Sequence, residues 1–278
     1  MGKETKAVAK AAPQVLATVP EFMKGLAGAG TENLGAADVE VPRIKLLQAL
    51  SPEVQEGDFK ANTFFHTVAE ESLGSEVEII PVFIEQSFIL WRPRNSGGGI
   101  LARSMDGIHW TPAVGEFDVK LNSGKQVKWK LAPTVAASGL ADWGSSDPDD
   151  PNSQPAATRM YNVVVVMPDF VSLSPAVLTM QRSAIKVARK FIGRLRLSNA
   201  PAFGQKFIMS GVKDSSTAGE FFNFKFTPNG LVEDRVTFDL CRELYEAFRK
   251  KGVKVGGIEG LEGEGAEAPA SAGTGEDI

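Results

Sequence analysis

Runs and alternations of hydrophobic residues predict most of the strands in this chain. Two β-branched runs, Tyr161–Met167 and Ser174–Met180, are almost wholly apolar, which is typical of strands buried on both faces. Residues Glu76–Trp91 predict one long strand that bends at Pro81, because proline cannot donate to the hydrogen-bonded ladder. Shorter elements are expected at Val41–Pro52 (a strand or one to two helical turns), Asn62–Thr67, Lys206–Ser210 and Glu220–Phe226, the last two as a hairpin around Asp214–Gly219.

Two amphipathic helices are predicted from apolar residues that recur every three or four positions. The first lies within Gln181–Leu197, where the apolar stripe consists of Ile185, Ala188, Phe191, Ile192 and Leu195. The second is Glu233–Lys251, which ends in two lysines that suit the negative end of a helix dipole. Several strands with two helices predict a β-rich α+β fold.

Composition divides the chain into three parts. Residues 1–37 are rich in Ala, Gly and Lys and predict a flexible N-terminal arm, and residues 257–278 predict a disordered tail. Between them, residues 38–256 are expected to form a single domain. Residues 145–158 contain three prolines and no periodicity, so we expect an exposed loop there.

Length and composition suit a globular intracellular protein. The chain has 278 residues, of which 43% are hydrophobic and 23% charged, enough for a substantial core. One cysteine and two histidines cannot make a disulfide framework or a cysteine-rich zinc site, and we expect no metal or cofactor. No apolar run approaches a membrane span and the N-terminus lacks a secretion signal, so the expected location is the cytoplasm.

Positive charge is concentrated around the first predicted helix. Residues 151–208 contain eight Lys or Arg and one acid, whereas the whole chain has a net charge of −4. Clustered cations focus the electric field over one face, which favours a polyanionic partner. The alternative is a solvated helix face whose charges are balanced by acids elsewhere in the fold.

The last 22 residues carry the opposite charge. Residues 257–278 contain six acids and no base, so the rest of the chain is about +2. A tail of this kind can compete with nucleic acid for a cationic groove, and it can dock on partner proteins. It can equally be a solubilising tail without a specific role.

Motifs of catalysis are absent from the sequence. There is no nucleophile elbow, no His-Glu-X-X-His zinc motif and no dinucleotide glycine fingerprint. Pro168-Asp169 could start a nuclease motif, but the Glu-X-Lys that should follow is missing. His66 and His109 are far apart in the sequence. We therefore expect a binding protein, not an enzyme.

Aromatic residues next to cations favour single-stranded nucleic acid as the ligand. Phosphates require a cationic track, and exposed bases require flat rings, with stacking contributing ~1–3 kcal/mol per base. Each aromatic residue has the alternative role of core packing. The candidate cations are Arg92, Arg94 and Arg103 near a glycine-rich loop, Lys128 and Lys130, and Arg182, Lys186, Arg189 and Lys190; the stacking candidates are Trp91, Trp110 and Trp129, with Phe221 beside Lys225 as a further possibility.

Three stretches of the chain, Val41–Val54, Ile89–Gly99 and Gln181–Arg196, resemble a family of replication-region proteins of tailed bacteriophages that bind single-stranded DNA. The terminal Gly-Glu-Asp-Ile is similar to the acidic tails of bacterial and phage single-stranded DNA-binding proteins. The resemblance implies an elaborated OB-like β-barrel with appended helices. It also implies that the tail, through Glu276, Asp277 and Ile278, recruits replication partners.

Together these features predict a protein that binds and protects single-stranded DNA, without sequence preference, during phage replication and recombination. Two other functions fit the same sequence. One is a phage structural or assembly protein whose basic helix forms a subunit interface. The other is an inhibitor that binds a host protein, with the acidic tail mimicking nucleic acid.

Overall fold

A computed structural model of the chain describes residues 41–216 and 219–251, and all of them belong to one compact unit. The predicted N-terminal arm and acidic tail lie outside the described residues. The strands are β1 (Arg43–Leu46), β2 (Phe64–His66), β3 (Glu71–Gly74), β4 (Glu76–Trp91), β5 (Ile100–Ser104), β6 (Gly115–Lys120), β7 (Gln126–Leu131), β8 (Ala157–Val166), β9 (Ala176–Gln181), β10 (Gln205–Ser216) and β11 (Gly219–Leu231). The α-helices are α1 (Pro52–Gln55), α2 (Val135–Ser138), α3 (Ala184–Leu197) and α4 (Arg235–Lys251).

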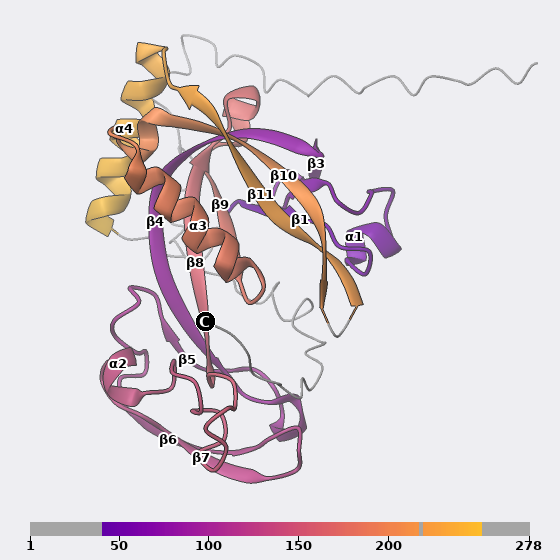
Figure 1. The fold of residues 1–278 in the computed structure, drawn as a ribbon, viewed down its shortest axis with the longest axis vertical. Helices are drawn as coiled ribbons and strands as arrows, with labels where there is room; N and C mark the ends of the chain where they lie inside the picture. The colour runs from indigo at the N-terminus through magenta and orange to yellow at the C-terminus, as the bar shows by residue number, and fades with distance from the viewer. Residues whose placement is uncertain (1–40, 217–218, 252–278) are drawn as a thin grey trace, which may run out of the picture. The chain divides into compact units, whose positions relative to one another are not determined.

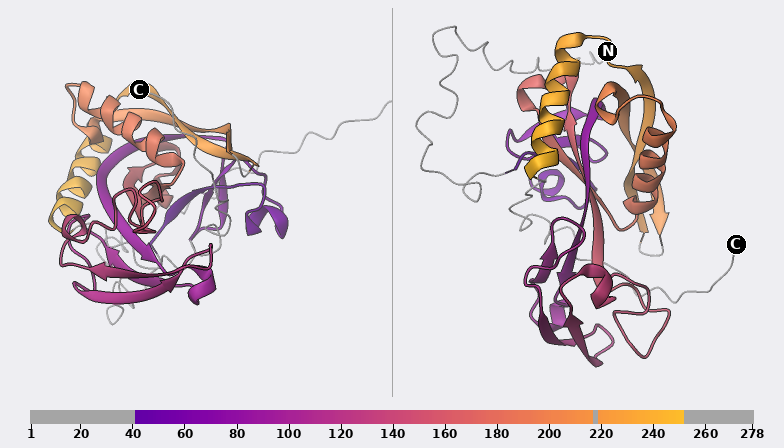
Figure 2. Two further views of the ribbon diagram at one scale, coloured as in Figure 1. Left: turned by 60° about the horizontal axis from the view of Figure 1, so that its bottom comes forward. Right: turned by 90° about the vertical axis from the view of Figure 1, so that its left-hand side faces the viewer.

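Nine of these strands form one sheet, in the order β11-β10-β4-β8-β9-β1-β2-β3, with β5 pairing with β4 beside this path (Figure 1). The pairs are antiparallel except β1 with β9, which run parallel. The sheet curls into a half-barrel (Figure 2, left). β6 and β7 form a separate two-stranded sheet.

The long strand β4 has the predicted bounds and organises the sheet. Its first residues pair with β10, its last residues pair with β5, and β8 lies along its other side. The register with β8 shifts between Pro81 and Phe83, where proline cannot donate a hydrogen bond. Such irregularities bend a strand and increase its twist, which accounts for the curved path of β4 in Figure 1.

Each face of the sheet is covered by one long helix. Successive side chains of β8 point to opposite faces, so each face carries apolar residues that a helix can bury. Val163 and Val165 pack in a cluster with α3, and Val164 and Val166 pack in a cluster with Cys241 of α4. Figure 2 (right) shows the two helices on opposite sides of the strands. The wholly apolar runs predicted to be buried on both faces are therefore confirmed.

A third core lies under the β6–β7 sheet. Trp110 and Trp129 pack there with Phe88 and Leu90 of β4. Exposed and buried residues alternate strictly along β7, as the sequence predicts for a strand with one face in water.

The β-rich α+β fold is confirmed. The predicted hairpin forms from β10 and β11, and the predicted helices are α3 and α4. An OB barrel has five strands, whereas this sheet has nine, so the OB prediction is not confirmed. Within residues 41–251, apart from the two omitted at the hairpin turn, no helix is long and apolar enough to cross a membrane.

Candidate nucleic-acid interface

Helix α3 carries a buried face that fixes it on the sheet. Ala184, Ala188, Phe191 and Leu195 recur at three- and four-residue steps and are all buried. Phe191 stacks on Phe226 of β11, with ring centroids 4.2 Å apart. This aromatic contact anchors the helix against the hairpin.

The opposite face of α3 is exposed and cationic. Lys186, Arg189, Lys190 and Arg196 are exposed, and α3 contains no acidic residue. Among the described residues, Arg189, Lys190 and Arg196 have no acid within ion-pair distance. This row of side chains, which we call the cation row, is therefore not balanced by nearby charge.

Lys186 of the cation row and Arg182 lie at the start of the helix. Lys186 lies close enough to Asp214 to influence its pKa, although the two do not form an ion pair. The pKa of Asp214 is lowered mainly by a hydrogen bond from Asn223 Nδ2, and the charge of Lys186 lowers it further. Arg182 is exposed, and its backbone lies in the left-handed region with φ 51°, where the chain leaves β9 for the helix.

Arg194 has a structural role. Its Nη1 donates a hydrogen bond of 2.6 Å to the carbonyl oxygen of Phe226. The guanidinium is half-buried and points along the contact with β11. It is thus held by the fold and does not join the cation row.

Lys128 and Lys130 are balanced by acids. They lie on β7 opposite Asp118 and Glu116 of β6, in direct cross-strand register. Lys130 Nζ is 3.2 Å from Glu116, and Lys128 is within 4 Å of both acids. The sequence suggested that both lysines belong to a phosphate-binding track, but here they form a ladder of opposite charges.

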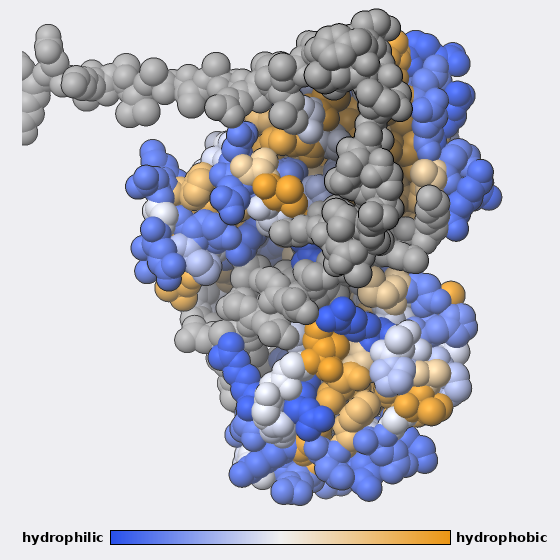
Figure 3. All heavy atoms as spheres, turned by 180° about the vertical axis from the view of Figure 1, so that it is seen from behind, coloured by the Kyte–Doolittle hydropathy of each residue, from blue (hydrophilic) through white to orange (hydrophobic). Residues whose placement is uncertain are grey.

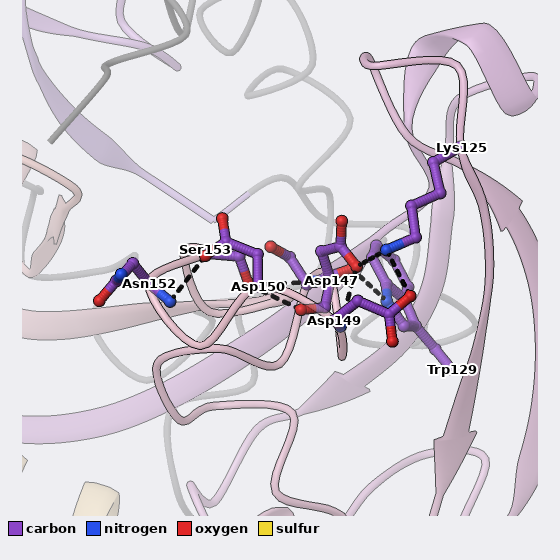
Figure 4. Close-up of polar contacts among 8 residues, drawn as sticks. Lys125, Trp129, Asp147, Asp149, Asp150, Asn152 and Ser153 are labelled. Carbon is purple, nitrogen blue, oxygen red and sulfur yellow. Dashed lines mark hydrogen bonds and ion pairs between the residues drawn. The ribbon is translucent and has the colours of Figure 1, made fainter.

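Lys125 is held even more closely. Its Nζ forms ion pairs with Asp147 and with Asp149, the latter at 2.8 Å (Figure 4). The hydrogen bond from Lys125 holds the pKa of Asp147 below its usual value. Lys206, Lys213 and Arg242 also pair with acids, namely Glu78, Glu220 and Asp239. The cation row on α3 differs from all of these.

The glycine-rich loop forms a second, separate group of cations. Arg92 and Arg94 follow the C-terminal end of β4. Arg103 lies on β5, opposite Ile89 of β4. Gly97, Gly98 and Gly99 all have positive φ, and the loop is tied to the β6–β7 turn by Asn95 Nδ2 on the Leu121 carbonyl, at 2.5 Å. Figure 1 shows β5, which carries Arg103, in the lower part of the view and α3 in the upper part.

The predicted stacking residues divide by burial. Trp110 and Trp129 are 2% and 4% exposed, and their indole N–H groups donate to Ser138 Oγ and to the Ser146 carbonyl. Neither ring can reach a base without leaving the core, so we remove both from the interface. Trp91 is half-buried and packs on the α4 side of the sheet, where part of its surface remains accessible.

Sequence reasoning missed Trp143, the most exposed tryptophan. It lies in the loop after α2 and is 72% exposed. Seen from behind, the lower part of the molecule shows hydrophobic residues bordered by hydrophilic ones (Figure 3). The segments around β5–β7 also expose Ile108 and Val114. No local pattern distinguishes Trp143, because its neighbours are acids and glycine and not the cations that the prediction required.

In the described part of the chain, no group of three or more His, Cys, Asp or Glu side chains is placed to hold a metal ion.

Comparison with models of known protein families gives a match over most of the chain. The model of a family described as Pam3 phage gp34-like protein matches residues 8–254. No curated protein and no solved structure matches the chain.

Proposed function

Because the chain belongs to the Pam3 phage gp34-like protein family, we propose that it is a phage protein that binds single-stranded DNA, with the exposed face of α3 as the principal contact. The observation that carries the proposal is the cation row. Its members remain without ion pairs in a fold that pairs Lys125, Lys128 and Lys130 with acids. A charge that the fold leaves unbalanced is available to a ligand.

The length of the cation row favours a polymer over a small anion. From Lys186 to Arg196 the helix rises about 15 Å, at 1.5 Å per residue, so one phosphate cannot contact the whole row. Lys and Arg that contact phosphates position a nucleic acid without reading its sequence. The proposed binding is therefore independent of sequence. Trp91, next to Arg92, packs on the α4 side of the sheet, opposite α3, so the contact proposed for α3 is with phosphates and not with stacked bases.

Fluorescence anisotropy of a labelled poly-dT oligonucleotide, titrated at several salt concentrations, tests the proposal. The variant Lys186→Ala/Arg189→Ala/Lys190→Ala should bind at least about tenfold more weakly at low salt, and its salt slope should fall by about 2, because each lost phosphate contact removes ~0.7 from the slope for single strands. A duplex of the same length shows whether the preference is for single strands.

The matched control carries the same change in net charge. Lys206→Ala/Lys213→Ala/Arg242→Ala removes three cations that are already paired with acids, and its affinity should stay within about twofold of the wild type, since paired surface charges contribute little. Equal weakening of both triple variants would show that net charge, not α3, governs binding. No binding of poly-dT by the wild type would favour a phage assembly protein instead.

The acidic tail enters the proposal as a modulator. Deleting residues 257–278 should tighten binding to poly-dT, because six negative charges would no longer compete with the DNA for α3. Unchanged affinity would show that the tail does not compete with DNA for α3. The role left to test would then be recruitment of partners through Glu276, Asp277 and Ile278.

A further inference from the structure

Gly193 interrupts the exposed face of α3. It lies in the interior of the helix, three residues after Lys190 and three before Arg196, and is itself exposed. Glycine in a helix interior destabilises the helix relative to alanine, because it loses more backbone entropy on folding. A glycine at this position therefore calls for a reason.

The fold supplies no such reason. Apart from its two chain neighbours and the adjoining backbone of α3, a Cβ at Gly193 would meet no heavy atom of the described chain within 4 Å, and its φ lies outside the left-handed region. Other glycines are explained by their surroundings. At Gly107 a Cβ would lie 2.7 Å from the carbonyl oxygen of Gln86, and at Gly211 it would collide with the side chain of Asn62. Packing within the described residues therefore does not require a glycine at this position.

The residues next to Gly193 on the surface of α3 indicate which kind of ligand could contact it. Residues three and four positions away on a helix share one face, so Arg189 and Lys190 flank Gly193 on one side. Arg196 and the exposed Leu197 flank it on the other. The missing side chain leaves the helix backbone bare at this point, which we call the notch, between Lys190 and Arg196, which are about 9 Å apart along the helix axis at 1.5 Å per residue. A phosphodiester seated there would meet positive charge on both sides and the bare backbone of the helix between them.

We propose that Gly193 is a positioning residue for DNA, where the sugar–phosphate backbone lies directly against α3. The inference rests on the proposed function and adds to it the point of closest approach. It also explains why a position in an otherwise good helix lacks a side chain: any larger residue would hold the strand away from Arg189, Lys190 and Arg196.

Two substitutions test the notch in the full chain, with poly-dT anisotropy and thermal unfolding as the two readouts. Gly193→Ala should raise the unfolding midpoint by about 2 °C or more and weaken poly-dT binding about threefold. Gly193→Leu, equally compatible with a helix, should weaken binding about tenfold or more, which corresponds to ~1.4 kcal/mol. A stability gain with an affinity loss is the expected signature.

The control introduces leucine at another exposed helical position. Ala247→Leu on α4 should leave the affinity unchanged. If the wild type binds poly-dT and Gly193→Leu binds equally well, the notch is wrong and the proposed function stands. If Gly193→Ala lowers the unfolding midpoint, the glycine has a structural role and the inference is overturned. A changed sedimentation coefficient with unchanged DNA affinity would assign the notch to self-association and overturn it too. Failure of the wild type to bind is the separate result that removes the proposed function.

Discussion

The side-chain amide of Gln48 pairs with the backbone of Phe222 as a neighbouring strand would. Its Nε2 donates to the Phe222 carbonyl at 3.0 Å, and its Oε1 accepts from the Phe222 N–H at 2.7 Å. Gln48 follows β1, and Phe222 lies on β11, which ends the strand order on the far side of the sheet. Two hydrogen bonds from one side chain thus join the two arms of the curl.

Replacing this amide should weaken the fold. Gln48→Ala leaves the N–H and C=O of Phe222 without these partners, and we expect a loss of ~1–3 kcal/mol in the free energy of unfolding. Urea denaturation followed by circular dichroism measures it. Gln126→Ala, at an exposed position on β7, is the control and should change stability by less than about 0.5 kcal/mol. Equal midpoints for both variants would show that the Gln48 link contributes nothing.

A buried polar chain between β4, β8 and β9 gives a second prediction. Asn162 Nδ2 donates to Ser87 Oγ, and Thr179 Oγ1 donates to Asn162 Oδ1, both at 2.9 Å. Asn162 and Ser87 are each 2% exposed. Asn162→Ala should cost ~2 kcal/mol or more, because it leaves the Ser87 hydroxyl unsatisfied in the core.

A double-mutant cycle separates this coupling from lost packing. Once Ser87→Ala is present, Asn162→Ala should cost less, since no orphaned hydroxyl remains. Strict additivity of the two losses in the free energy of unfolding would contradict the hydrogen bond. Asn122→Ala, at an exposed position, is the reference for an amide that faces solvent.

The stability of the protein should depend on His66 as the pH falls. The ring is 2% exposed, its Nδ1 accepts from the Ala69 N–H, and its Nε2 lies 3.2 Å from the Leu173 carbonyl. Burial lowers the pKa of His66, so the unfolded chain takes up the proton more readily than the folded one. Its contribution is complete above the unfolded pKa of about 6.5 and is lost as the pH falls further, at up to ~1.4 kcal/mol per pH unit.

Urea unfolding at pH 7.5, 6.5 and 5.5 tests this dependence. His66→Gln should be less stable at pH 7.5 but should lose less stability toward pH 5.5 than the wild type. A wild-type stability that does not change across this range would refute the assignment.

Tryptophan fluorescence can test the revised interface directly. In Trp91→Phe/Trp143→Phe only the buried Trp110 and Trp129 remain, so acrylamide quenching should be weak and poly-dT should leave the emission unchanged. In Trp143→Phe alone, any quenching by poly-dT reports Trp91. Quenching by poly-dT in the double variant would show that Trp110 or Trp129 contacts the DNA.

Local patterns predicted the elements well because the physics that forms them is local. The apolar run from Glu76 to Trp91 is β4 with the same bounds, and the lack of acids in α3 could be read directly from the chain. The alternation of Lys128 and Lys130 even held the signal that Trp129 points inward, because neighbours on a strand face opposite sides.

Pairing between distant segments could not be predicted in this way. The neutralisation of Lys130 depends on the register that places Glu116 opposite it. The parallel contact of β1 with β9 pairs Arg43 with Val177, which are 134 residues apart in the sequence. The same limit explains why cations with similar local sequences, Lys128 and Lys190, have different surroundings in the fold.

The bond from Arg194 to the Phe226 carbonyl has one more consequence. With Phe191 stacked on the same residue, α3 is held at two points near β11 and cannot roll about its own axis. The direction in which Arg189, Lys190 and Arg196 face is therefore fixed before any ligand binds. The entropy cost of orienting the helix is incurred during folding, so it does not reduce the free energy of ligand binding.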